Sequence, residues 1–130
     1  MSTNSLTAKD KMKKIHEFPV LQTNSSLKKA LDEMTEKRLG VACFVDSNGT
    51  LAGLLTDGDL RRLLLSNQSP LPALLISDAI NFGTRKPTVA KVESSLGEIS
   101  KIMIEKQLWD IPVVDSTNKL LGLLHRHDVS

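Results

Sequence analysis

The chain repeats itself, and this duplication restricts the possible folds more than any other feature of the sequence. A shift of 69 residues, which needs no gap, places Val20 on Val89 and Asp59 on Asp128. Short runs between these positions are identical in the two copies: Ser25–Leu27 and Ser94–Leu96, Val45–Ser47 and Val114–Ser116, Gly53–Leu55 and Gly122–Leu124. Self-similarity at one fixed offset indicates a duplicated structural unit. We therefore expect two copies of one small α/β (α+β) fold.

Each copy predicts the same order of elements, which is strand, helix, strand, turn, strand and helix. The first helix of each copy has apolar residues at intervals of three and four, the spacing of one buried helix face. These residues are Leu27, Ala30, Leu31 and Met34 in the first copy and Leu96, Ile99, Ile102 and Met103 in the second. Ser95 and Glu98 predict a capping box, whereas Ser26 is followed by Lys29 and predicts a different cap.

The remaining strands are short and rich in β-branched and apolar residues, as buried strands usually are. We expect them at Val41–Val45 and Leu51–Leu55 in the first copy, and at Ile111–Val114 and Leu120–Leu124 in the second. The first pair is joined by a turn that contains Asn48-Gly49, a strong hairpin signal. Cys43 lies in the middle of a predicted strand and is expected in the core.

The duplication also sets the expected domain bounds. Residues 1–12 predict a flexible lead-in, residues 13–65 the first domain, residues 66–77 a connector and residues 78–130 the second domain. The helix expected after Asp59 has its counterpart after Asp128, where only two residues follow. We expect that this final helix is truncated and that the chain is an excerpt of a longer protein. The alternative is that the second copy has lost the helix.

Composition argues against several classes of protein. Hydrophobic residues make up 40% and charged residues 25%, which is typical of soluble globular proteins. No apolar run approaches the ~20 residues needed to cross a bilayer. The single cysteine suits a reducing cytoplasm. The net charge of +2, with three Phe, one Trp and no Tyr, argues against nucleic-acid binding. We expect a cytoplasmic protein with neither membrane nor nucleic acid as a partner.

The last strand of the first copy leads into Gly53-Leu54-Leu55-Thr56-Asp57-Gly58-Asp59, and this motif in this order of elements resembles the CBS domain. The resemblance covers both copies, from about residue 8 to the end. It implies a tandem pair of β-α-β-β-α repeats (a Bateman module) related by a pseudo-twofold axis. It also implies two clefts that bind adenosine-containing nucleotides, so AMP, ADP and ATP are candidate ligands and no further cofactor is required.

Thr56 and Asp59 are the first candidate ligand-binding residues. A carboxylate in the first turn of a helix is stabilised by the helix dipole, and it can accept both hydroxyls of a ribose. Thr56 offers a hydroxyl at the end of the strand, and the free backbone N–H groups of the helix start attract an anion. The alternative is that Thr56 or Asp59 only caps the helix, as both residue types commonly do.

The second copy departs from this pattern at the corresponding position. The resemblance carries Asp128 over as a ribose ligand, but His125 stands where the first copy has Thr56. An imidazole there would donate to a phosphate, stack on a base, or serve the structure alone. His125-x-His127 with Asp128 also admits a zinc site. The helix expected at this point breaks the strand alternation that would place both imidazoles on one face, so we expect no metal.

The resemblance adds further positions to the expected site. Trp109, Ile111 and Pro112, with Val41 in the first copy, lie where the backbone of CBS domains faces the base. Thr88 lies where members of the family often place a Ser or Thr on the ligand. Trp109 would cover a base or ribose, or would be an ordinary, partly buried aromatic residue.

The run Leu55–Arg62, with the closing His125-Arg126-His127-Asp128, resembles the C-terminal half of KpsF/GutQ-type arabinose-5-phosphate isomerases. In that family a sugar-isomerase (SIS) domain precedes two CBS domains, and the product leads to Kdo, a sugar of lipopolysaccharide and capsule. The resemblance implies a regulatory chain, not an enzyme by itself, whose partner is the SIS domain of a parent chain. CMP-Kdo is then a second candidate ligand. The CBS pair of sugar-phosphate nucleotidyltransferases is the alternative parent.

Two classes of function remain open at this point. The first is a ligand-sensing module that changes its shape or dimer geometry when a ligand binds. The second is a purely structural pair that forms a homodimer, with clefts that no longer bind; His125, and Cys43 in place of the proline of the second copy, favour it. A catalytic function has little support, because no nucleophile, base and acid occur at suitable spacing and no catalytic residue can be placed.

Overall fold

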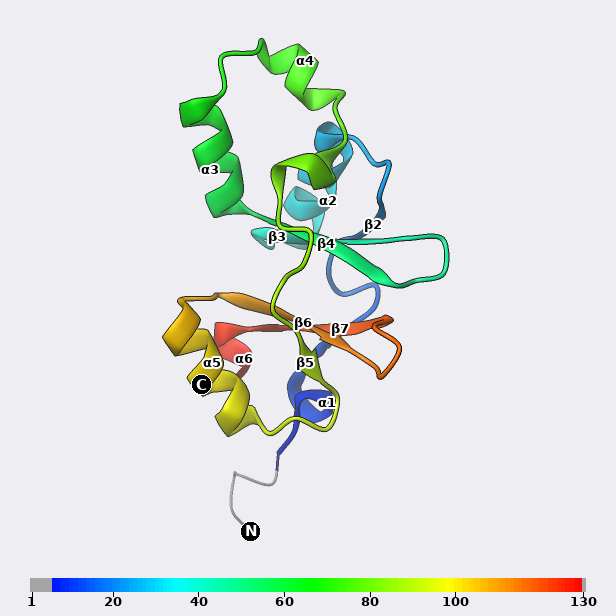
Figure 1. Ribbon diagram of the computed structural model, residues 1–130, viewed down its shortest axis with the longest axis vertical. Coiled ribbons are helices and arrows are strands. Elements are labelled where there is room, and N and C mark those ends of the chain that lie inside the picture. Colours follow the sequence, from blue (N-terminus) through cyan, green and yellow to red (C-terminus); the bar gives the residue numbers. More distant parts are fainter. Residues whose placement is uncertain (1–5, 130) are drawn as a thin grey trace. The chain divides into compact units, whose positions relative to one another are not determined.

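The computed structural model describes residues 6–129, which form two compact units (Figure 1). The first-copy unit is His16–Pro87. The second-copy unit combines residues 88–129 with residues 6–15. Each unit has its own sheet and its own hydrophobic core, as the duplication predicts. No helix within residues 6–129 has the length and apolar content needed to span a bilayer.

The first-copy unit contains a three-stranded sheet in the order β2-β3-β4, with β2 parallel and β4 antiparallel to the central strand. Its elements are β2 (Val20–Gln22), α2 (Leu27–Lys37), β3 (Val41–Val45), β4 (Leu51–Thr56), α3 (Asp57–Ser66), α4 (Leu71–Leu75) and the 3₁₀ helix η2 (Ala79–Phe82). The core lies between the sheet and the helices, where Phe44 and Leu55 meet Ala30 and Met34 of α2. Cys43 is buried, as expected.

The second-copy unit repeats this arrangement in a four-stranded sheet with the order β1-β7-β6-β5. Its elements are α1 (Ala8–Lys11), β1 (Lys13–Lys14), β5 (Ala90–Lys91), α5 (Leu96–Lys106), β6 (Asp110–Val114), β7 (Leu120–His125) and α6 (Arg126–Val129). Ile99 and Met103 of α5 pack with Ile111, Val113 and Leu124 of the sheet, so the predicted apolar face of this helix is the buried one.

The long helices of the two copies begin with the same serine cap. Ser95 Oγ accepts the backbone N–H of Glu98 at 3.2 Å, and Ser26 Oγ accepts that of Lys29 at 3.1 Å. The expectation of a capping box at Ser95 and of a different cap at Ser26 is therefore wrong, because both helices have the single serine bond. The serine hydroxyl bonds the backbone three residues on, and this bond does not depend on which side chain stands there.

The leading segment of each copy belongs to the unit of the other copy. Residues 8–14, mostly within the expected flexible lead-in, form α1 and β1 in the second-copy unit, where Ala8 is fully buried and its N–H donates to Ser94 O at 2.9 Å. Strand β1 pairs with β7, so it covers an edge whose backbone groups would otherwise lack partners. Gly122 permits this approach, because a Cβ there would lie 2.7 Å from Lys13 O.

Residues 77–84, which lead the second copy, cover an edge strand of the first-copy unit in the same way. Leu54 and Thr84 exchange two backbone hydrogen bonds, of 2.9 and 2.8 Å, along the free edge of β4. The expected connector is also structured, since it contains α4, whose Leu74 is buried in the core. The structural units therefore differ from the expected bounds of 13–65 and 78–130, because each edge strand is completed by a segment distant in sequence.

Candidate ligand-binding site

Thr56 and Asp59 are brought together at the junction of β4 and α3. The Asp59 Oδ2 atom accepts the Thr56 N–H at 3.0 Å and the Thr56 hydroxyl at 3.1 Å, while Thr56 Oγ1 accepts the Asp59 N–H at 3.3 Å. This is a complete capping box. Thr56 and Asp59 therefore cap helix α3, which is the structural role given above as the alternative to ligand binding. This cap holds the Asp59 carboxylate in one orientation.

The second oxygen of the Asp59 carboxylate pairs with an exposed cation. Asp59 Oδ1 lies 2.6 Å from a guanidinium nitrogen of Arg62, whose side chain is 72% exposed, whereas that of Asp59 is 14% exposed. An ion pair with such an exposed partner contributes little to stability. A ligand hydroxyl can therefore replace Arg62 at small cost.

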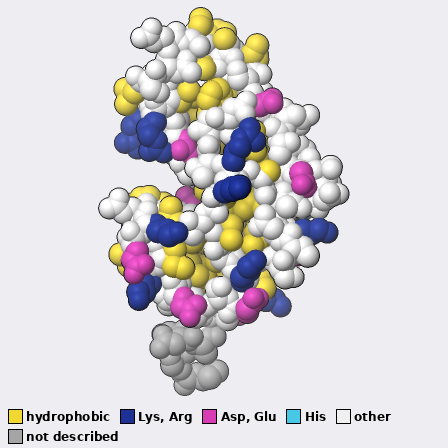
Figure 2. Space-filling view, viewed as in Figure 1, with side chains coloured by type: hydrophobic (Ala, Val, Ile, Leu, Met, Phe, Trp, Pro, Cys, Tyr) yellow, Lys and Arg dark blue, Asp and Glu magenta, His cyan; other side chains and the backbone are white. Residues whose placement is uncertain are grey.

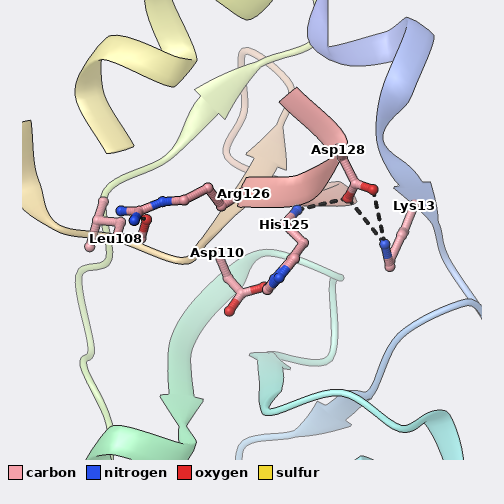
Figure 3. Close-up of polar contacts among 6 residues, drawn as sticks. All are labelled: Lys13, Leu108, Asp110, His125, Arg126 and Asp128. Carbon is pink, nitrogen blue, oxygen red and sulfur yellow. Dashed lines mark hydrogen bonds and ion pairs between the residues drawn. The ribbon is translucent and has the colours of Figure 1, made fainter. Parts of the chain in front are cut away.

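Asp128 repeats this geometry in the second-copy unit. Its Oδ2 atom accepts the backbone N–H of His125 at 2.8 Å, as Asp59 accepts that of Thr56. Its counterion is Lys13 from β1, with Nζ 3.1 Å from Oδ2 and 3.3 Å from Oδ1 (Figure 3). Both copies therefore present a helix-start carboxylate that is fixed by a backbone N–H and neutralised by a basic side chain.

His125 occupies the threonine position but faces a different partner. Its Nδ1 atom lies 2.9 Å from Oδ1 of Asp110, whose side chain is only 8% exposed. Burial raises the pKa of Asp110 above its ordinary value, while the hydrogen bond and charge of His125 act in the opposite direction. The Nδ1 atom of His125 therefore bonds to Asp110 within the unit, and only its Nε2 atom can contact a ligand.

Replacing Asp110 with Asn should reveal this raised pKa as a change in the pH dependence of stability. Because the native-state pKa of Asp110 is raised above the unfolded value of 3.8, the folded protein keeps more protons bound than the unfolded chain does between these two pKa values. The free energy of unfolding of the wild type should therefore contain a component that falls as pH rises from 3.8 through the raised pKa. Urea denaturation across acidic pH should show this component in the wild type and lose it in Asp110→Asn.

The matched control for this experiment is Glu93→Gln, which removes an exposed carboxyl group of the same unit. Its stability should follow the wild-type pH dependence. Parallel curves for the wild type and Asp110→Asn would contradict the raised pKa.

Arg126 stabilises the loop between α5 and β6. One guanidinium nitrogen donates to Leu108 O at 2.7 Å and to Met103 O at 3.1 Å, and the guanidinium carbon lies 4.3 Å from the centre of the Trp109 ring. The Arg126 N–H also donates to Trp109 O at 2.7 Å. Figure 3 shows this side chain pointing toward Leu108 and away from Asp128. Arg126 therefore neutralises the carbonyl end of α5 and holds Trp109 in place.

The remaining predicted positions differ in their access to a ligand. Trp109 is 56% exposed, so a base can reach it, and its ring lies 6.2 Å from that of His125. Val41, Ile111 and Pro112 are buried, so only their backbone is available. Thr88 is partly exposed and its hydroxyl lies 3.5 Å from Lys106 Nζ.

Two residues with a clear part in these carboxylate sites were missed by sequence reasoning. Lys13 was counted as the first residue of the first copy, yet β1 carries it to Asp128. Asp110 precedes the predicted strand Ile111–Val114, whereas it begins β6, and its pairing with His125 follows from the register of β6 and β7. As for zinc, no group of three or more His, Cys, Asp or Glu within residues 6–129 is placed to hold a metal ion.

Comparison with known proteins places the chain in a family. It matches the CBS domain twice, over residues 8–66 and over residues 77–130. The chain belongs to the CBS domain family. The crystal structure of CBSX2 in complex with AMP is similar to this CBS pair, with a TM-score of 0.82 and 28% identity over 95% of this chain and 92% of that one.

Relatives of this CBS pair occur in longer proteins. An uncharacterized protein of Helicobacter pylori strain J99 is 39% identical over 86% of this chain and 33% of its own length. The arabinose 5-phosphate isomerase KdsD of Pseudomonas aeruginosa is 34% identical over 86% of this chain and 33% of its own length. The CBS pair thus spans about a third of the length of these relatives. The resemblance to part of the arabinose 5-phosphate isomerases is confirmed.

Proposed function

We propose that this CBS pair is a regulatory module that binds an adenine nucleotide, with Asp59 and Asp128 as the ribose-binding carboxylates. The observation that carries the proposal is the repeated carboxylate geometry. In each unit the carboxylate accepts a backbone N–H of the preceding strand end and also pairs with a basic side chain, and Asp59 accepts the Thr56 hydroxyl as well. The similar CBSX2 binds AMP, which supports the choice of ligand.

The chemistry of a ribose suits this arrangement. Its two adjacent hydroxyls can both donate to one carboxylate, and hydrogen bonds to a charged acceptor are stronger than neutral ones. The basic side chain displaced from the carboxylate remains near the ligand, where it can neutralise a phosphate. In the first-copy unit this residue is Arg62, and in the second-copy unit it is Lys13. Trp109, where it is exposed, offers its ring to a base.

We further propose that the module regulates an attached sugar-phosphate isomerase domain. The support is the similarity to arabinose 5-phosphate isomerases, of which this chain covers about a third. A regulatory ligand must then bind two states of the parent protein with different affinity. CMP-Kdo is the alternative ligand, because it would report the output of such a pathway. With either ligand, the proposed location of the module is the cytoplasm.

A homodimer is the second candidate role, and exposed apolar side chains of the first-copy unit favour it. Four large apolar side chains are exposed between residues 64 and 76, namely Leu64, Leu65, Leu71 and Ile76. Figure 2, in the orientation of Figure 1, shows apolar side chains on the surface over α4. Exposed apolar patches often mark protein–protein contacts. Sedimentation velocity with and without nucleotide would separate a constitutive dimer from a ligand-dependent one.

Calorimetric titration with AMP, ADP, ATP, S-adenosylmethionine and CMP-Kdo tests the proposal. At least one ligand should bind and raise the melting temperature. Asp59→Asn and Asp128→Asn keep the shape of the side chain and its acceptor for the cap, but remove the charge. Each should weaken binding at its own site by about 2 kcal/mol, roughly 30-fold.

The matched control is Asp32→Asn, which removes an exposed carboxylate from α2 that pairs with Lys28. It should leave every affinity unchanged. Absence of binding for all five ligands at millimolar concentration would refute the sensor function and leave the structural one.

A further inference from the structure

An open pocket of about 320 Å³ lies in the first-copy unit, between the end of α2 and the start of α3. The proposed nucleotide site does not use it. Its lining includes Met34 and Leu39 at the end of α2, Gly40 before β3, and Asp57 at the first position of α3. Apolar side chains, the acidic Asp57 and the basic Arg38 therefore line this pocket beside the carbonyl end of a helix.

The internal repeat shows what the equivalent position holds in the second-copy unit. The shift of 69 residues places these four residues on Met103, Leu108, Trp109 and Arg126. Those are the residues of the arginine cluster described above, in which the Arg126 guanidinium donates to the carbonyls of Met103 and Leu108 and stacks on Trp109. The pocket of the first-copy unit thus corresponds to a place where the second copy holds a guanidinium.

The backbone around the two positions is the same, although the side chains are not. Asp57 N donates to Gly40 O at 3.0 Å, as Arg126 N donates to Trp109 O at 2.7 Å. Leu39 N donates to Met34 O at 3.1 Å, as Leu108 N donates to Met103 O at 2.8 Å. The carbonyl groups that receive the guanidinium in one copy therefore have the same local arrangement in the other.

The substitutions between the copies open the pocket and move its basic side chain, since aspartate replaces arginine at position 57 and Arg38 stands where the second copy has Gln107. Glycine at position 40 removes the ring that stacks on the guanidinium, and aspartate at position 57 replaces the arginine itself. A Cβ on Gly40 would collide with Asp57 Oδ2, so the carboxylate lies against the Gly40 backbone at the pocket. Where the second copy supplies a cation, the first copy supplies an anion beside the negative end of α2.

We propose that this pocket binds a guanidinium group from outside the first-copy unit, in addition to the Arg38 side chain of its lining. The Asp57 carboxylate would pair with the planar guanidinium through two parallel hydrogen bonds, and the Leu39 carbonyl would accept another. The apolar side chains of Leu31 and Met34, which also line the pocket, would pack against the attached carbon chain. A compact ammonium group, which cannot bond as a fork, should bind less well.

Two-dimensional amide NMR of the whole chain, titrated with methylguanidinium, tests this inference. The amide signals of Leu39, Gly40 and Asp57 should shift and saturate, and methylammonium should have a weaker effect. Asp57→Asn should weaken methylguanidinium binding about fivefold, a modest change because Asp57 is exposed. Shifts that do not saturate, or that are equal in Asp57→Asn, would overturn the inference.

A second variant tests the correspondence between the copies directly. Asp57→Arg should place a guanidinium in the pocket from within, so it should abolish methylguanidinium binding and raise the melting temperature. Continued binding by Asp57→Arg would count against the inference. Because Asp57 lies outside the proposed nucleotide contacts, Asp57→Asn should bind AMP as the wild type does, and the two proposals can fail separately.

The source of the guanidinium is distinguished by two further ligands. Free L-arginine should bind more tightly than N-acetyl-arginine amide if the natural ligand is a small molecule, because Arg38, also in the lining, can pair with its carboxylate. The blocked amide should bind at least as tightly if an arginine side chain of another protein is the natural occupant. Failure of both to bind would refute the guanidinium site.

Discussion

Replacing Arg126 with methionine is expected to lower the free energy of unfolding of the second-copy unit by about 3 kcal/mol. The variant removes two hydrogen bonds from a charged donor, to Leu108 O and Met103 O. It also removes the cation–π contact with Trp109. Methionine retains the apolar stem, so the expected loss arises from the two charged hydrogen bonds and the ring contact rather than from a cavity; Met103 O keeps its bond from the Leu108 N–H. Urea denaturation, followed by far-ultraviolet circular dichroism, measures the change.

Tryptophan fluorescence gives an independent readout of the same variant. Trp109 is the single tryptophan of the chain, so its emission reports this loop alone. Without Arg126 against its ring, the indole should become more accessible to acrylamide. Arg61→Met, at an exposed position of α3, is the control and should change neither stability nor quenching. A loss below about 1 kcal/mol, the size of one ordinary hydrogen bond, would show that other contacts hold the loop.

Replacing Gly83 with alanine should cost the first-copy unit about 3 kcal/mol, the upper end of the usual penalty for overpacking. The added Cβ would collide with the carbonyl oxygen of Leu54, and it would lie 3.0 Å from the carbonyl carbon of Leu54 and 3.2 Å from Leu55 Cα. All three atoms belong to the backbone of β4, which cannot move away without breaking the adjacent hydrogen bonds between Leu54 and Thr84. Since β4 ends at Thr56, the variant should also weaken any ligand binding that depends on Asp59.

A second glycine of the same unit provides a control, for which alanine is expected to raise the free energy of unfolding instead of lowering it. Gly58 lies in the first turn of α3, where an added Cβ would meet only the flexible Arg62 side chain and the Thr56 hydroxyl, at 3.4 Å or more. Alanine is favoured over glycine in a helix, so Gly58→Ala should raise stability by about 0.5 kcal/mol. A loss of less than about 1 kcal/mol in Gly83→Ala would mean that residues 77–84 can separate from β4 at little cost.

Much of the local structure could be predicted because it depends on neighbouring residues. The apolar spacing of Leu27 to Met34 predicted the buried face of α2, and the run Val41–Val45 matches β3 residue for residue. The capping box at Thr56 and Asp59 could also be predicted, since it involves residues only three apart. The same local reasoning failed at Ser26, because it gave weight to Lys29, whose side chain takes no part in the serine cap.

Only half of the candidate site could be predicted from the sequence, because only half of it depends on neighbouring residues. Asp59 and its counterion Arg62 lie within one helix, so spacing brings them together. Asp128 has the corresponding position in the second copy, but its counterion Lys13 is 115 residues away in the chain. Nothing in the local pattern of residues 8–14 indicates that they complete the sheet of the second-copy unit.

The sequence by itself determined the duplication, the order of elements, the buried strands and the two helix-start carboxylates. These follow from periodicity and from caps, which act over a few residues. Only the tertiary structure decided that the leading segment of each copy joins the unit of the other, that Lys13 neutralises Asp128, and that Arg126 occupies a position left open in the first copy. These depend on backbone edges and carbonyl groups that need partners, and the partners were supplied by segments far apart along the chain.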